Sequence, residues 1–119
     1  VQEFFCRSVK LAEKAGLTKE KIILDIGIGF GKTLGQNLEL IRRQDEFMRF
    51  AGSDWPLLLG VSRKSFIGKV LAEPVAAERV AGTLSAGIVG MFSGAGILRV
   101  HDVAETVKTV KIAEAILDI

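Results

Sequence analysis

Three short clusters of polar and glycine residues carry the side chains in this sequence that could do chemistry. The first is DIGIGFGKT at residues 25–33, the second is SRKS at residues 62–65, and the third places Arg99 and His101 two positions apart. Together they offer a carboxylate, several cations and an imidazole. Such a set can bind the edge of a heterocycle and grip an anion such as a diphosphate.

The glycine-rich stretch at residues 25–33 resembles a nucleotide-binding loop, but its spacing does not fit one. A P-loop that ends in Gly31-Lys32-Thr33 needs its first glycine at position 26, where this chain has isoleucine. A dinucleotide-binding GxGxxG that starts at Gly27 needs its third glycine at position 32, where lysine stands. Both nucleotide-binding interpretations are therefore rejected.

Asp25 directly follows the apolar run Ile22-Ile23-Leu24, which places its carboxylate at the end of a buried strand. A carboxylate there is unfavourable unless hydrogen-bond donors pair with it. One interpretation gives Asp25 the backbone N–H groups of its own glycine turn, and the other gives it the N–H edge of a bound heterocycle. Phe30 stands between two glycines, so it is poorly placed for a core and could form a flat wall for an aromatic ring.

The other two clusters are basic. Arg63 and Lys64 follow an apolar run with no acid beside them, so they suit an anion or a carbonyl oxygen, although a solvated loop would look the same. Arg99 lies inside the apolar segment ILRV and needs a partner or a stacked plane. Alternation along a strand sends Arg99 and His101 to the same side, so we predict a diphosphate grip, although a single histidine is often structural. Asp102 is predicted to cap the last helix, because an acidic residue follows three positions later.

Three apolar runs precede these clusters and predict strands at Ile22–Leu24, Leu57–Val61 and Ile97–Val100. None alternates polar with apolar residues, which is typical of parallel strands that are covered on both faces. Segments with helical spacing lie before, between and after the runs. Their predicted apolar faces are Phe5/Val9/Ala12, Leu34/Leu38/Ile41/Met48, Val80/Leu84/Ile88/Met91 and Val103/Val107/Val110/Leu117. The alternation predicts an α/β fold in which the three clusters meet at the carboxyl ends of parallel strands.

Length, charge and cysteine content limit the class of protein. The 119 residues are enough for one domain but too few for a complete (β/α)8 barrel of about 250 residues. The sequence starts at Val1 within a helical pattern, so we expect it to be a segment of a longer protein. The formal net charge of +2 gives no reason to expect nucleic acid or a membrane surface as a partner. A single cysteine, Cys6, excludes an internal disulfide and suggests a reducing, cytoplasmic setting.

The uncharged segment at residues 80–98 is long enough to span a membrane and contains a GxxxG at Gly90 and Gly94. Glycine and hydroxyl residues interrupt it, and Gly94-Ala95-Gly96 divides it into a helical part and a strand-like part. We therefore favour a buried helix, a turn and a buried strand over a membrane span.

Four motifs in order resemble the C-terminal half of the dihydropteroate synthase family: DIGIGFGKT, GVSRKSFIG, ERVAGTLSA and ILRVHDVAETV. The resemblance implies that residues 1–119 are one partial domain, made of helix five and then strands six to eight with their helices from a (β/α)8 barrel. It implies the joining of 6-hydroxymethyl-7,8-dihydropterin diphosphate to 4-aminobenzoate, the folate-pathway step that sulfonamides inhibit. Ile26 departs from the family, which usually has proline at this position.

The resemblance also assigns site residues. Asp25 and Lys64 would hold the edges of the pterin, while Arg99 would stack on its face and reach the diphosphate, which His101 would contact. Lys64, Arg99 and His101 are thus the predicted catalytic residues. Phe30 and Ser65 would form part of the aminobenzoate site. The full predicted substrate-binding set is Asp25, Gly29, Phe30, Ser62, Arg63, Lys64, Ser65, Arg99 and His101, and Lys32 and Thr33 are expected to be structural.

By the same resemblance, Mg²⁺ is the expected cofactor, and its ligand would lie in an N-terminal half that these residues do not include. A homodimer that binds small-molecule substrates is expected, and the chain alone is expected to be inactive. Two alternatives stay open. One is a self-associating half-barrel without enzymatic activity that binds pterin weakly, because open sheet edges and amphipathic helices favour dimers. The other is a related pterin-binding methyltransferase barrel.

Overall fold

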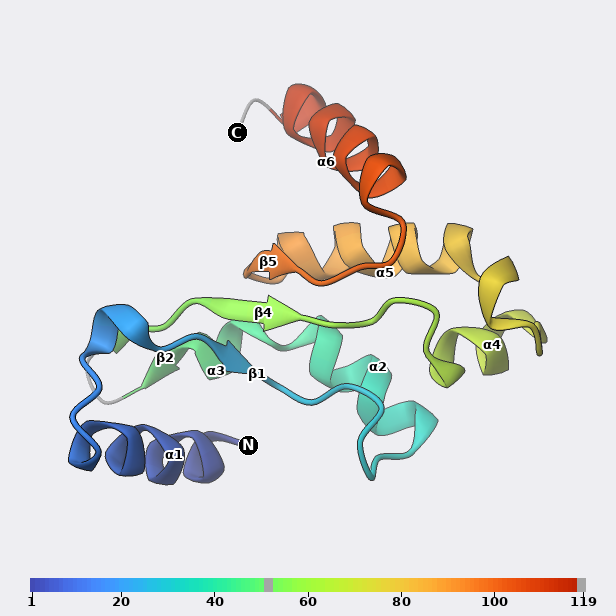
Figure 1. The fold of residues 1–119 in the computed structure, drawn as a ribbon. Coiled ribbons are helices and arrows are strands. Elements are labelled where there is room, and N and C mark those ends of the chain that lie inside the picture. Colours follow the sequence, from blue (N-terminus) through green and yellow to red (C-terminus); the bar gives the residue numbers. More distant parts are fainter. Residues whose placement is uncertain (51–52, 118–119) are drawn as a thin grey trace.

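A three-stranded parallel sheet forms the centre of the structure, a computed structural model that describes residues 1–50 and 53–117 (Figure 1). The strands are β1 (Leu24–Asp25), β2 (Arg49–Phe50), β3 (Ser53–Asp54), β4 (Leu57–Leu59) and β5 (Ala95–Leu98). The helices are α1 (Gln2–Lys14), α2 (Leu34–Arg42), α3 (Asp45–Met48), α4 (Ser65–Leu71), α5 (Val80–Phe92) and α6 (Val103–Leu117). Short 3-10 helices lie at Lys19–Lys21 and Ala76–Glu78.

The sheet confirms the predicted α/β class and the predicted parallel pairing. Its strand order is β1-β4-β5, so the three strands that carry the polar clusters are direct neighbours. In the register, Leu24 pairs with Leu57 across β1 and β4, and Leu58 pairs with Ile97 across β4 and β5. The antiparallel pair β2 and β3 was not predicted from the sequence.

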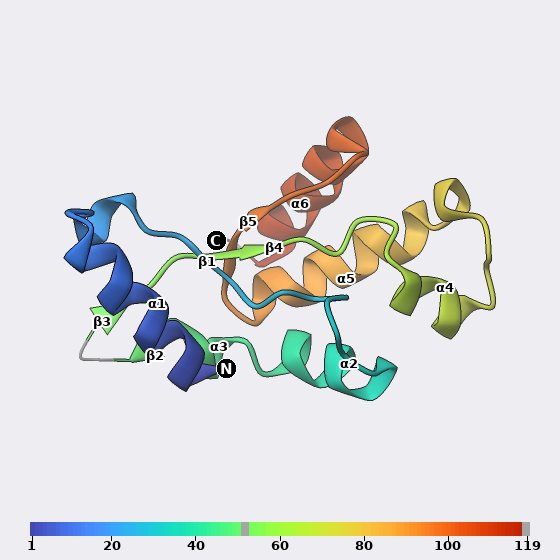
Figure 2. The ribbon, with the colours of Figure 1, turned by 60° about the horizontal axis from the view of Figure 1, so that its bottom comes forward.

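One face of the sheet is packed and the other is open, which corrects the prediction that the strands are covered on both faces. Leu57, Leu59 and Val61 point to the packed face and are at most 1% exposed. On the open face, Ile23 is 53% exposed and Ile97 is 38% exposed. Figure 2 shows α2 and α5 along the same side of the sheet. The apolar runs were not alternating because the open face is also apolar.

Small residues bring α5 close to the sheet, contrary to the predicted face of Val80, Leu84, Ile88 and Met91. The buried residues of this helix are Thr83, Gly87 and Gly90. A Cβ built at Gly90 would overlap the side chain of Leu59, so only glycine permits this approach. The large residues of the predicted face are half-buried instead. Part of that face, with Leu84 and Ile88, lies beside α6.

The segment at residues 80–98 folds as the predicted helix, turn and strand, but the strand β5 is not buried as expected, because only Ala95 in it belongs to the core. No helix within residues 1–50 and 53–117 is both long and apolar enough to cross a membrane.

The second predicted helix is divided into two. α2 ends at Arg42 and α3 begins at Asp45, and between them the fully buried Gln44 donates a hydrogen bond to the carbonyl oxygen of Gly90 at 2.5 Å. The buried face of α2 is formed by Asn37 and Ile41, whereas the predicted Leu38 is 43% exposed.

The first and last helices differ in how well they match their predicted faces. In α1, Phe5 and Val9 are buried as predicted. In α6 the buried residue is Thr106, while Val103 of the predicted face is 60% exposed. The α6 helix therefore leaves much of its apolar surface uncovered by the described residues.

Candidate active site

The carboxyl ends of β4 and β5 form a pocket that contains all three predicted catalytic residues. Its lining residues are Gly60, Ser62, Lys64, Arg99, Val100 and His101. Arg99 and His101 line the same pocket, as the sequence predicted, but both follow the end of β5, so strand alternation is not what brings them together. Because β1 is the other neighbour of β4, Asp25 and the glycine loop lie beside this pocket.

The glycine loop after β1 leaves the Asp25 carboxylate exposed. Its Oδ1 accepts a hydrogen bond from the backbone N–H of Gly27 at 2.8 Å. The interpretation in which Asp25 accepts from its own glycine turn therefore accounts for one contact. Farther along, the N–H of Gly29 donates to Oδ1 of the buried Asn37 at 2.9 Å. Gly27 and Gly29 have φ values of 71° and 88°, a region that favours glycine. The exposed carboxylate can accept further hydrogen bonds from a ligand.

Lys32 and Thr33 make structural contacts, in line with the resemblance. The Nζ of Lys32 donates to the carbonyl oxygens of Gly27 at 2.7 Å and Phe30 at 3.0 Å. Thr33 caps α2 through reciprocal hydrogen bonds with Gln36. The lysine amine is thus used to hold the loop.

Lys64 reaches from the end of β4 to the glycine loop. Its Nζ donates to the carbonyl oxygen of Ile28 and lies 4.9 Å from the centre of the Phe30 ring. Its alkyl chain covers Gly29, where an added Cβ would come within 3.2 Å of Cδ. Lys64 and Phe30 therefore share one wall of the site, and Phe30 is 70% exposed, as expected of a residue outside the core.

The charges around Lys64 favour an anionic ligand. Burial lowers the pKa of Lys64; the Asp25 carboxylate opposes this shift, and the positive charges of Arg99 and Lys32 add to it. An anion placed among these cations would relieve their mutual repulsion.

The Arg99 guanidinium lies over Gly60, the residue that follows β4. A Cβ at Gly60 would come within 3.3 Å of its Nη2 and 3.4 Å of its Nε, so the absence of that Cβ lets the guanidinium lie there. The backbone N–H of Arg99 donates to the carbonyl oxygen of Leu59 at 3.0 Å. Since Arg99 is exposed, the other face of its guanidinium plane is available for stacking.

The side chain of Ser62 holds the His101 ring. The Oγ of the buried Ser62 accepts the backbone N–H of His101 at 3.1 Å and lies 2.7 Å from its Nδ1. The Ser62 hydroxyl can donate to Nδ1, and in the tautomer that accepts this hydrogen bond the imidazole proton lies on Nε2. Nε2–H is then the donor that His101 can offer to an anion.

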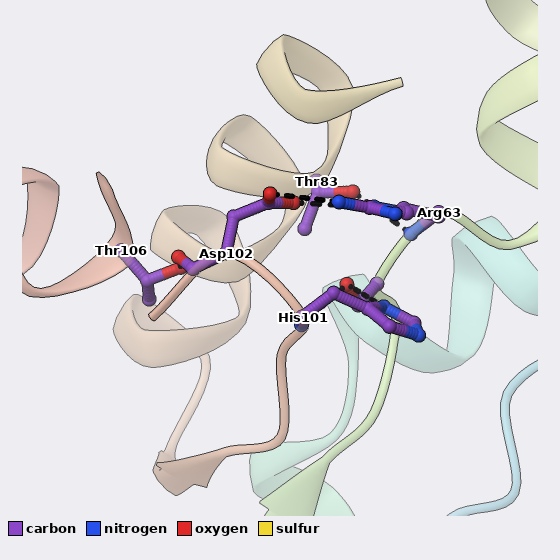
Figure 3. Close-up of polar contacts among 6 residues, drawn as sticks. Arg63, Thr83, His101, Asp102 and Thr106 are labelled. Carbon is purple, nitrogen blue, oxygen red and sulfur yellow. Dashed lines mark hydrogen bonds and ion pairs between the residues drawn. The ribbon is translucent and has the colours of Figure 1, made fainter. Parts of the chain in front are cut away.

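Arg63 and Asp102 form an ion pair beside this contact (Figure 3). Nη2 of Arg63 lies 2.8 Å from Oδ1 of Asp102, and Nε lies 3.3 Å from Oδ2. The pair lowers the pKa of Asp102, chiefly through the hydrogen bond from Arg63. Asp102 was expected only to cap α6, so this partner was not predicted from the sequence.

The structure thus brings some of the predicted residues together in the pocket and leaves others outside its lining. Ser62, Lys64, Arg99 and His101 share the pocket, whereas Ser65 lies outside its lining as the exposed first residue of α4. The contributions of Gly60 and Asn37 were missed. A polar asparagine on the apolar face of a predicted helix was the one available signal for Asn37.

Within residues 1–50 and 53–117, no group of three or more His, Cys, Asp or Glu side chains could hold a metal ion.

Comparison with known proteins identifies the family. Residues 1–101 match the family described as pterin binding enzyme. The chain belongs to this family. The dihydropteroate synthase of Escherichia coli K12 is 44% identical over 117 residues, which cover 98% of this chain and 40% of that protein. The chain thus spans about 40% of the length of this curated pterin-binding relative.

Solved structures of pterin-binding enzymes agree. The dihydropteroate synthase of Xanthomonas albilineans in complex with 7,8-dihydropteroate is 33% identical, with a TM-score of 0.93 over 99% of this chain and 45% of that one. The same enzyme with 4-aminobenzoic acid gives a TM-score of 0.92 over 99% of this chain and 44% of that one.

Proposed function

We propose that this chain forms the pterin-binding and diphosphate-binding part of a dihydropteroate synthase. The observation that carries the proposal is the convergence of Lys64, Arg99 and His101 on one pocket, next to the exposed carboxylate of Asp25. The similarity to dihydropteroate synthases over 98% of the chain supports the same activity.

Each group has a role that its geometry suits. Asp25 accepts hydrogen bonds from the N–H edge of the pterin, and Lys64 donates to a pterin acceptor from the opposite side. Arg99 stacks on the pterin face with its guanidinium plane and reaches the diphosphate, to which His101 donates from Nε2. Phe30 and Ser65 contribute to the aminobenzoate side.

The reaction is a substitution at the methylene carbon attached to the pterin. The C–O bond to diphosphate breaks and the electron pair leaves with the diphosphate. The amine of 4-aminobenzoate forms a C–N bond to the same carbon and loses a proton. The cationic groups of Lys64 and Arg99, with the N–H of His101, stabilise the charge on the leaving diphosphate. The protein also holds the two substrates in line.

The remaining parts of the proposal concern what lies around the chain. We propose that the three strands belong to the C-terminal part of a (β/α)8 barrel and that the whole protein is a cytoplasmic homodimer. Mg²⁺, when bound, would neutralise part of the diphosphate charge, with ligands from outside the described residues.

A chimera tests the proposed function: this chain replaces the matching segment of the E. coli dihydropteroate synthase, and formation of 7,8-dihydropteroate is measured. We expect activity, and we expect Lys64→Met to lower kcat/KM about 100-fold. Lys69→Met is the matched control, because Lys69 is an exposed lysine of α4. A folded but inactive chimera, or a Lys64→Met chimera as active as the control, would overturn the proposal.

The open face of the sheet favours one alternative, a self-associating half-barrel without activity. That alternative predicts weak pterin binding by a dimer of the chain and no product from the chimera. A pterin-binding methyltransferase also predicts pterin binding without dihydropteroate formation, so the product assay separates both alternatives from the proposed function.

A further inference from the structure

The residue between two site residues has an unusual backbone conformation. Arg63 follows Ser62 and precedes Lys64, and its φ is 57°, in the left-handed region that non-glycine residues rarely adopt. Such a conformation persists only when the surrounding contacts hold it. The contacts of Arg63 therefore decide where its two neighbours point.

Three contacts hold Arg63 from different directions. Its backbone N–H donates to Oγ1 of Thr83 at 2.9 Å, and its carbonyl oxygen accepts from Nη1 of Arg79 at 2.9 Å. Its guanidinium makes the two-point contact with Asp102. Thr83 is only 1% exposed, so the backbone anchor is part of the packed core.

The Asp102 contact joins the ends of two neighbouring strands. Arg63 contacts Asp102 (Figure 3), and the preceding residue, Ser62, contacts His101. Two consecutive residues after β4 are thus bonded to two consecutive residues before α6. The side chain of Asp102 is 17% exposed and that of Arg63 is 31% exposed, so water competes with this ion pair only in part.

We propose that Asp102, acting through Arg63, is a positioning residue that sets the places of Lys64 and His101 in the pocket. This inference rests on the proposed function. It assigns Arg63 to Asp102 rather than to direct substrate binding, because the bidentate contact already occupies Nε and Nη2. Asp102 touches neither substrate in this arrangement.

The test uses the same chimera with Asp102→Asn, which removes the charge at nearly constant volume. We expect kcat/KM for the pterin diphosphate to fall about tenfold, because Lys64 and His101 are displaced. The KM for 4-aminobenzoate should change by less than about twofold, since the proposed function assigns both displaced groups to the pterin diphosphate. Asp102→Glu should restore part of the activity.

Asp54→Asn is the matched control, because it also removes the charge of an aspartate that pairs with an arginine. The exposed ion pair that it breaks, Arg49–Asp54 at 2.7 Å, lies outside the lining of the pocket. If Asp102→Asn behaves like this control, or if its loss of activity only follows a loss of folded protein in thermal melts, the inference is wrong.

A double-mutant cycle with Arg63→Met tests the coupling. We expect the double variant to be no worse than either single variant, since the two residues act as a unit. If Arg63→Met raises the KM for 4-aminobenzoate while Asp102→Asn does not, Arg63 binds substrate directly and the inference is overturned. An inactive parent chimera would instead reject the proposed function.

Discussion

At the scale of single residues, the site depends on two glycines that leave room for neighbouring side chains. Gly60 lets the Arg99 guanidinium lie over it, and Gly29 lets the Lys64 chain cross the glycine loop. A cation that lies against backbone has fewer accessible rotamers, so it is better prepared to meet a ligand.

We expect Gly60→Ala to weaken diphosphate binding several-fold while leaving the fold intact. The added Cβ would come within 3.3 Å of the flexible end of Arg99, which can move away but then leaves its place. Binding of inorganic diphosphate to the chimera, measured by calorimetry, checks this. Gly35→Ala is the control, because a Cβ there meets nothing within 4 Å. Equal affinity in the two variants would contradict the role given to Gly60.

The Arg63–Asp102 pair predicts an acid-dependent part of the stability. Arg63 lowers the pKa of Asp102, so as the pH falls the unfolded carboxyl takes up its proton before the folded one. The stabilisation is therefore complete above the ordinary pKa of aspartate and is lost as the pH falls through the lowered one. Urea unfolding of the chimera and its Asp102→Asn variant between pH 7 and pH 3 should show a smaller acid slope for the variant. Identical slopes would mean that the pair does not contribute.

At the scale of elements, the close approach of α5 to the sheet positions the strand ends. Gly90 faces Leu59, and Gln44 bonds to the Gly90 carbonyl oxygen, so one glycine contacts both the sheet and the break between α2 and α3.

We expect Gly90→Ala to destabilise the protein by about 1–3 kcal/mol, because its methyl group overlaps Leu59 in a packed core. The free energy of unfolding in urea measures the effect. The Gly35→Ala change in α2 adds a methyl group in open space, so helix propensity should make it neutral or slightly stabilising. If both variants have the same stability, α5 does not pack as tightly as described.

At the scale of the whole molecule, the sheet has an open apolar face and uncovered helices. Ile23 and Ile97 are exposed on the sheet, and Val103 and Ile116 are exposed on α6, the latter at 77%. Several exposed apolar side chains on one sheet face and one helix predict a covering partner.

We expect the 119-residue chain alone to self-associate and to form a soluble 1:1 complex when expressed with the remaining segment of the E. coli enzyme. In the proposed barrel that segment would supply the other strands, so the complex should form dihydropteroate. Size-exclusion chromatography with light scattering measures both states. A chain that folds as a monomer and does not bind the added segment would contradict this expectation.

The sequence by itself determined the class of fold and most of the pocket. Buried strand runs followed by polar clusters are local patterns, so the parallel strands and the meeting of Lys64, Arg99 and His101 could be predicted. Arg99 and His101 were predicted to share one side by strand alternation, yet both lie in the loop after β5, and that loop brings them to the pocket. The family motifs extended this to the expected substrates.

Only the tertiary structure decided the contacts between segments distant in sequence. The Arg63–Asp102 pair joins residues 39 positions apart, and Gln44 meets Gly90 across 46 positions. The small residues of α5 faced the sheet because helix and sheet approach until the smallest side chains touch, which no local hydrophobic pattern records. The open face of the sheet escaped prediction for the same reason, since an apolar residue looks alike in sequence whether its cover is present or not.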